Sequence, residues 1–147
     1  MNIGNERQLF LDSLMVSEVK GVERRLHHPT RRELVLTPDR PWETVGMPSC
    51  VGYFQDGDTY RLWYRCDDNS EGNPRFTGYA ESQDGVNWEK PNLGILDYKG
   101  SRDNNLVWTG ENGMQDLTPF KDGNPDTPED QRYKAVVRQK DTQYLFP

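Results

Sequence analysis

The clearest pattern along the chain is an alternation of side chains between two faces. Over residues 59–66, one face of an extended strand would carry Tyr60, Leu62, Tyr64 and Cys66. Because successive side chains of a β-strand point to opposite faces, this period of two predicts a strand. Residues 50–54 are also typical of a strand, and the Asp-Gly pair at 56–57 favours a tight hairpin between the two.

Two further strands are predicted after this hairpin. Residues 76–82 have the composition of a strand, and a second Asp-Gly pair at 84–85 turns the chain into residues 86–90. Pro91 ends the last strand, because proline has no N–H to donate to a ladder. Residues 49–90 therefore predict a four-stranded antiparallel meander and an all-β fold.

The hairpin pattern recurs later in the chain. Residues 54–57 lead into the strand at 59–66, and residues 120–123 lead through a longer loop into residues 133–137. Repeated antiparallel sheets of four strands are the units, or blades, of a β-propeller. The repeat predicts an N-terminal segment at 1–48, a first blade at 49–110 and an incomplete second blade at 111–147.

A propeller closes only with four or more blades, so the chain is expected to be part of a longer fold. The hydrophobic content of 33% is thin for a self-sufficient core of 147 residues, which agrees with that expectation. An open blade edge would expose unpaired backbone groups and allow self-association.

Charge and composition exclude several classes of protein. The net charge is −6, which disfavours a nucleic-acid partner because an acidic chain repels phosphates. Apolar runs reach only about three residues, whereas a membrane-spanning helix needs about twenty. No signal peptide is visible, so the expected location is the cytoplasm by default, and it is left open if the true N-terminus lies upstream of Met1.

The residue types needed for metal or cofactor chemistry do not cluster. Cys50 is expected opposite Trp63 or Tyr64 in the first hairpin, too far from Cys66 for a disulfide. The two histidines are neighbours in the sequence, and the cysteines lack zinc-binding spacing. No phosphate-binding loop or dinucleotide fingerprint occurs, so no cofactor and no metal are predicted.

One segment resembles a known signature. Residues 79–90, with the sequence YAESQDGVNWEK, resemble the A-x-S-x-D-G-x-x-W blade motif of five-bladed propeller glycosidases, such as glycoside hydrolase families 32, 43, 68 and 130. Further stretches resemble a group of bacterial glycosidase-like proteins, at 8–12, 38–43, 88–94, 100–105, 118–122 and 132–134. The resemblance covers nearly the whole chain and implies the N-terminal part of a five-bladed β-propeller. The spacing of Trp88 from the Asp-Gly turn separately predicts that it lies in an outer strand and packs against a neighbouring blade, in preference to stacking on a sugar.

The resemblance also implies where catalytic groups would lie. Glycoside hydrolysis uses two carboxylates, which propeller glycosidases place just before the innermost strands of different blades. Asp116 then resembles the acid that stabilises the transition state in family 32, although Gln and Leu flank it instead of Arg and Pro. The plainer interpretation is a solvent-exposed loop residue. Asp122 lies at a turn and is interpreted as a hairpin residue.

The first blade holds no acid at 46–50, where family 32 would have its nucleophile. Glu43 is the nearest candidate for a base or nucleophile, and Trp42 beside it is a candidate stacking platform for a sugar ring. A surface glutamate next to a packed tryptophan is the plainer alternative. Asp12 is a weaker third candidate, and the general acid of these families lies in a later blade.

The resemblance therefore implies a glycoside hydrolase-like propeller with carbohydrate as its partner, and leaves open whether it is an enzyme. One alternative is a non-catalytic carbohydrate-binding propeller. The other is an inactive fragment of a truncated gene.

Overall fold

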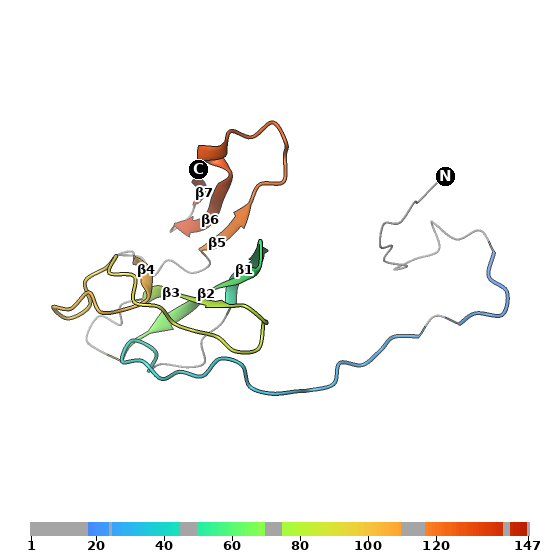
Figure 1. The fold of residues 1–147 in the computed structure, drawn as a ribbon, viewed down its shortest axis with the longest axis horizontal. Helices are drawn as coiled ribbons and strands as arrows, with labels where there is room; N and C mark the ends of the chain where they lie inside the picture. The colour runs from blue at the N-terminus through green and yellow to red at the C-terminus, as the bar shows by residue number, and fades with distance from the viewer. Residues whose placement is uncertain are drawn as a thin grey trace. The chain divides into compact units, whose positions relative to one another are not determined.

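The computed structural model describes residues 18–23, 25–44, 50–69, 75–109, 117–139 and 142–146. The chain divides into two units, Met1–Arg32 and Glu33–Pro147, and each is described by itself. The described residues of the first unit run without helix or strand (Figure 1). The second unit consists of antiparallel strands with one short 3-10 helix, so the predicted all-β class is confirmed for the described residues.

The first sheet, sheet one, follows chain order. It contains β1 (Cys50–Asp56), β2 (Thr59–Asp67), β3 (Arg75–Ser82) and β4 (Leu106–Thr109), paired in the order β1-β2-β3-β4. The predicted Asp-Gly hairpin joins β1 to β2, and Gly57 at its tip has a φ of 62°, which glycine adopts without strain. Cys50 pairs with Tyr64, as predicted, and both cysteines are free.

The predicted fourth strand at 86–90 is wrong. After β3, the chain forms a long loop that touches the sheet only through a bridge between Glu81 and Glu89, and the fourth strand is β4. The loop turns because the Asp84 carboxylate accepts hydrogen bonds from the backbone N–H groups of Val86 and Asn87, at 2.8 and 2.7 Å. An aspartate that binds the backbone two and three residues ahead holds a turn and not a strand.

Trp88 accordingly does not lie in an outer strand. Its indole N–H donates to the carbonyl oxygen of Gly85 at 3.0 Å, and its ring packs, partly buried, against the core of sheet one. The side chain belongs to the loop that covers the sheet.

The core lies on one face of sheet one. The alternation predicted for β2 places Tyr64 and Cys66 on this face, beside residues of β3 and β4. Residues from two loops cover it, and Trp42 and Tyr98 meet edge to face with ring centroids 5.3 Å apart. Gly78 leaves room for the Tyr64 ring, because a Cβ at this position would lie 2.8 Å from Tyr64 Cζ.

The second sheet, sheet two, contains β5 (Thr118–Lys121), β6 (Tyr133–Gln139) and β7 (Thr142–Phe146) in the order β5-β6-β7. The longer loop between β5 and β6 includes the 3-10 helix Glu129–Gln131. Arg132 holds this loop together by donating to the carbonyl oxygens of three of its residues, at 2.8 to 3.3 Å: Asp122, Asn124 and Thr127.

The two sheets meet through their first strands. The Thr118 hydroxyl of β5 donates to the carbonyl oxygen of Val51 in β1 at 2.9 Å. Gly52 of β1 faces Pro119 of β5 so closely that a Cβ would lie 3.0 Å from Pro119 Cδ. Neither sheet closes on itself within the described residues.

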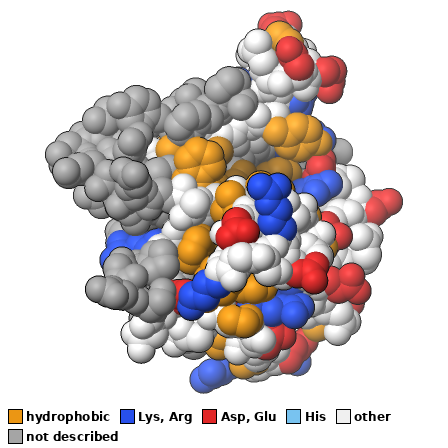
Figure 2. All heavy atoms as spheres, turned by 90° about the vertical axis from the view of Figure 1, so that its left-hand side faces the viewer, with side chains coloured by type: hydrophobic (Ala, Val, Ile, Leu, Met, Phe, Trp, Pro, Cys, Tyr) orange, Lys and Arg blue, Asp and Glu red, His pale blue; other side chains and the backbone are white. Residues whose placement is uncertain are grey.

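The side chains on the face drawn in Figure 2 are mixed in type. Hydrophobic groups are interspersed with Lys, Arg, Asp and Glu and do not form one continuous patch. No helix of the described residues is long and apolar enough to cross a membrane.

Candidate functional site

The candidate residues Glu43 and Trp42 lie in the segment that covers the core of sheet one. Glu43 closes a turn there, because its backbone N–H donates to the carbonyl oxygen of Arg40 at 3.0 Å. Its carboxylate folds back over the same turn, and Oε2 accepts the backbone N–H groups of Asp39 and Arg40 at 2.9 and 3.1 Å. The carboxylate therefore fixes the shape of the segment that carries it.

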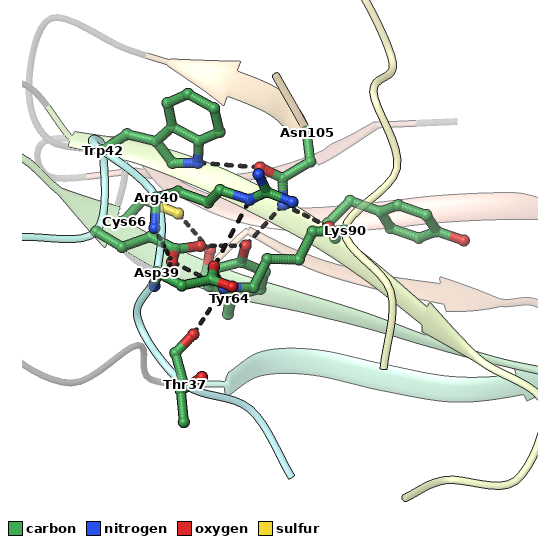
Figure 3. Close-up of polar contacts among 10 residues, drawn as sticks. Thr37, Asp39, Arg40, Trp42, Tyr64, Cys66, Lys90 and Asn105 are labelled. Atoms are coloured by element: carbon green, nitrogen blue, oxygen red, sulfur yellow. Dashed lines mark hydrogen bonds and ion pairs between the residues drawn. The ribbon is translucent and has the colours of Figure 1, made fainter. Parts of the chain in front are cut away.

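Tyr64 from sheet one and Lys90 from the long loop, both labelled in Figure 3, complete the surroundings of Glu43. The Tyr64 hydroxyl donates to Oε1 at 2.6 Å, and the Lys90 ammonium donates to Oε2 at 2.8 Å. Lys90 also donates to Asp39 Oδ1 and to the carbonyl oxygen of Thr37, both at 2.8 Å. The Glu43 side chain is 0% exposed and that of Lys90 is 5% exposed, so this is a buried ion pair with its hydrogen bonds satisfied.

Tyr64 extends these contacts toward Trp42. Its hydroxyl oxygen accepts a hydrogen bond from Asn105 Nδ2 at 2.6 Å, and Asn105 Oδ1 accepts one from the Trp42 indole at 2.9 Å. Burial raises the pKa of Tyr64 far above its ordinary value, so the phenol remains a neutral donor. We call the five residues Lys90, Glu43, Tyr64, Asn105 and Trp42 the buried polar network.

The chemistry open to this network follows from its burial. No atom of the Glu43 side chain is exposed, so in this geometry the carboxylate has no surface from which to take a substrate proton or attack a sugar carbon. Trp42 is only 7% exposed and presents no face for a sugar ring to stack on. The structure thus brings Glu43 and Trp42 together as structural groups, and their catalytic and binding roles stay predictions.

Of the other candidate acids, Asp122 lies within the described residues and holds the loop after β5. Asp116 and Asp12 lie outside the described residues. Asp122 accepts hydrogen bonds from Lys134 Nζ at 2.5 Å and from the Thr127 hydroxyl at 2.9 Å. The Lys134 ammonium, with these other donors, holds the pKa of Asp122 well below its usual range. This is the hairpin role predicted from the sequence.

A second candidate site is a cleft of about 520 Å³ between sheets one and two, which we call the inter-sheet cleft. Its walls combine aromatic and charged side chains: Phe54, Asp56, Arg61, Trp63, Pro119, Phe120, Tyr133, Lys134 and Ala135. Such a mixture of apolar surface and a few polar groups is typical of ligand sites.

Aromatic rings form one continuous part of the wall. Phe54 and Trp63 are stacked, with centroids 5.3 Å apart and planes inclined by 23°. The ring centroid of Tyr133, in sheet two, lies 6.5 Å from that of Phe54. The wall therefore draws on both sheets.

Asp56 connects the two sheets at this cleft. Its carboxylate accepts hydrogen bonds from Lys121 Nζ at 2.7 Å, Tyr133 Oη at 3.0 Å and Arg61 Nε at 3.1 Å. The Lys121 ammonium is the main cause of a lowered pKa at Asp56. Arg61 in turn donates to Tyr79 Oη at 2.8 Å. Burial, together with a hydrogen bond to Glu81, raises the pKa of Tyr79 to about 12.

Sequence reasoning did not identify this cleft. The signal was present, because Arg61 and Trp63 fall on the face of β2 opposite the core and Phe54 opens the repeated hairpin pattern. Tyr133, however, is 77 residues away from Asp56, and only the packing of the sheets brings the two together.

Comparisons with known proteins give short matches. No family model matches the chain, and no solved structure matches it. Two relatives from Mycobacterium tuberculosis are similar: the uncharacterized protein MT1551 of strain CDC 1551 / Oshkosh and the uncharacterized protein Rv1502 of strain ATCC 25618 / H37Rv. Each is 42% identical over 51 residues, which is 32% of this chain. The matched stretch spans 17% of the length of each relative.

Proposed function

We propose that the chain is part of a glycosidase-like β-propeller protein that acts on or binds a carbohydrate. The observation that carries the proposal is the packing of two successive antiparallel sheets through their first strands, β1 and β5. Neighbouring blades of a propeller are related in this way around a central channel. The D-G-x-x-W segment at 84–88 adds support through its resemblance to propeller glycosidases.

The inter-sheet cleft supports the carbohydrate part of the proposal. A sugar ring has an apolar C–H face and a rim of hydroxyl groups, so it is best bound by aromatic surfaces next to hydrogen-bonding side chains. Phe54, Trp63 and Tyr133 supply the first, and Asp56 and Arg61 supply the second.

The buried polar network favours a non-catalytic carbohydrate-binding protein as the second candidate. A glycosidase needs two carboxyl groups on either side of the scissile bond, roughly 5 to 10 Å apart. Glu43, the acid proposed for the first blade, has both oxygens engaged inside the protein. Hydrolysis by this family of proteins would then depend on other carboxylates.

Incubation of the protein with gluco-, xylo-, manno-, arabino- and fructo-oligosaccharides tests both candidates. Calorimetry measures binding, and release of reducing ends measures hydrolysis. The carbohydrate proposal expects at least one sugar to bind, and binding of none contradicts it. If hydrolysis occurs and survives in Glu43→Gln, Glu43 is not the base or nucleophile. Glu89→Gln, at an exposed position, is the matched control.

A further inference from the structure

The charged side chains of the inter-sheet cleft are balanced in sign, and this balance indicates which kind of carbohydrate the cleft would bind. Asp56 is paired with Lys121 and Arg61. Lys134 on the opposite wall is paired with Asp122. The charges that line the cleft are thus matched by partners of opposite sign.

The remaining interactions of Arg61 continue this balance. Its Nη1 atom donates to the Tyr79 hydroxyl at 2.8 Å, and that hydroxyl donates to Glu81 Oε2 at 2.8 Å. With Glu81 included, the charged groups connected to the cleft are three bases and three acids: Arg61, Lys121, Lys134, Asp56, Glu81 and Asp122. A charged ligand would have to break one of these pairs to gain a counter-charge, whereas a neutral polar ligand would not.

The aromatic side chains of the cleft offer a surface on which a ligand with a flat apolar face can pack. Tyr133 is 51% exposed, so much of its surface is open although the ring also lies against Phe54. Trp63 and Phe54 are half-buried and lie in one stacked pair. A volume of about 520 Å³ falls within the range of small-molecule sites.

We propose that the inter-sheet cleft binds an uncharged sugar, with its C–H face against Tyr133, Phe54 and Trp63 and its hydroxyl groups toward Asp56 and Arg61. The inference rests on the proposed function and names its site and ligand class. It assigns binding to residues outside the Glu43 and Trp42 pair and on both sides of the junction between the sheets.

The test of the site uses calorimetric titration of the full chain with five neutral trisaccharides of glucose, xylose, mannose, arabinose and fructose. For the one that binds best, Tyr133→Ala is expected to weaken binding about tenfold, because the exposed stacking surface is lost. Tyr133→Phe keeps the ring and is expected to weaken binding only about twofold. Tyr53→Ala is the matched control, since Tyr53 is 73% exposed and is the neighbour of Phe54 in β1, with its side chain on the opposite face of the sheet.

A cleft-filling variant makes the test independent of the stability of Tyr133→Ala. Ala135 lines the cleft, so Ala135→Trp is expected to abolish binding by occupying the space. Circular dichroism identifies which variants fold. Unchanged affinity in folded Ala135→Trp or Tyr133→Ala overturns the assignment of the site, and leaves the proposed function standing if the wild type binds sugar. If no trisaccharide binds the wild type, the proposed function fails, and this inference fails with it.

The ligand class is tested by charge. Trigalacturonate is expected to bind at least tenfold more weakly than the best neutral trisaccharide, and the neutral affinity is expected to change less than about twofold between low and high salt. Equal or tighter binding of trigalacturonate, or a steep salt dependence of neutral binding, overturns the uncharged class even if the cleft is the site.

Discussion

Replacement of Glu43 by alanine should destabilise the protein far more than an ordinary glutamate substitution. The change removes the acceptor of four hydrogen bonds, from the backbone N–H groups of Asp39 and Arg40, the Tyr64 hydroxyl and the Lys90 ammonium. The Glu43 side chain is 0% exposed, so water does not replace it without opening the segment around it.

The magnitude follows from the two buried side chains that lose an acceptor, Tyr64 and Lys90, because the backbone of the exposed Asp39 and Arg40 can turn to water. Lys90 keeps Asp39 Oδ1 and the carbonyl oxygen of Thr37, so its charge remains partly compensated. The buried Tyr64 hydroxyl loses the acceptor of its proton, and an unpaired buried polar group costs about 1–3 kcal/mol. Breaking a buried ion pair costs about 3–5 kcal/mol. Because Lys90 keeps two acceptors, we expect a loss of about 3 kcal/mol, a large part of a typical total of about 5–15 kcal/mol.

Urea unfolding, followed by tryptophan fluorescence, measures this loss of free energy of unfolding. In thermal unfolding we expect the Tm to fall by about 10 °C. Glu89→Ala is the control, because Glu89 is exposed, and it should change the free energy of unfolding by less than about 0.5 kcal/mol. A free energy of unfolding for Glu43→Ala within about 0.5 kcal/mol of wild type would refute the buried polar network as a stabilising element.

Three further outcomes are expected. Gly78→Ala should lower the free energy of unfolding by about 1–3 kcal/mol, because the new Cβ would lie 2.7 Å from Cys66 Sγ. Gly123→Ala is the control, because Gly123 has open space around it and the free energy of unfolding should not fall; urea unfolding measures both variants. In the native protein, Ellman's reagent should modify the exposed Cys50 but not Cys66, because Cys66 is buried and burial raises the pKa of its thiol. Reaction of two thiols in the absence of denaturant would contradict this prediction. Backbone hydrogen bonds lower the pKa of Asp84, so its stabilising effect is present above about pH 4 and is lost as the pH falls below that value. The urea midpoint of Asp84→Asn should therefore fall less than that of wild type between pH 4 and pH 2, and equal falls would contradict the argument.

The sequence predicted the elements that depend on neighbouring residues. The hairpin of β1 and β2 was predictable because the Asp-Gly turn and the alternation of β2 act over short distances. The second hairpin was found from the same pattern, although its loop is longer. β4 was missed because Leu106–Thr109 is only four residues long and pairs with β3 after an extended loop. The turn at Asp84 depends on side-chain hydrogen bonds, which a hydrophobic pattern does not reveal.

The sequence predicted that Glu43 and Trp42 lie together, but it did not predict that both are buried. Glu43 and Trp42 do lie in one cluster, but the two side chains that donate to Glu43 come from positions 21 and 47 residues further along the chain. An acid beside a tryptophan has the same local sequence whether it is exposed or buried. The difference depends on Tyr64 and Lys90, which the fold alone brings to it.

The hydrogen bond between Trp42 and Asn105 sets the order in which the protein can fold as it is synthesised. The two residues are 63 positions apart, and Leu106 beside Asn105 is fully buried in the same core. At about 5–20 residues per second, the ribosome needs roughly 3–13 seconds to make this stretch. In the later part of that interval, Tyr64 and Cys66 have been made and Tyr98 and Leu106 have not, so the core face of sheet one lacks these partners and is open to chaperones. Because Asn105 and Leu106 precede β5 in the chain, every residue of this core is synthesised before sheet two begins.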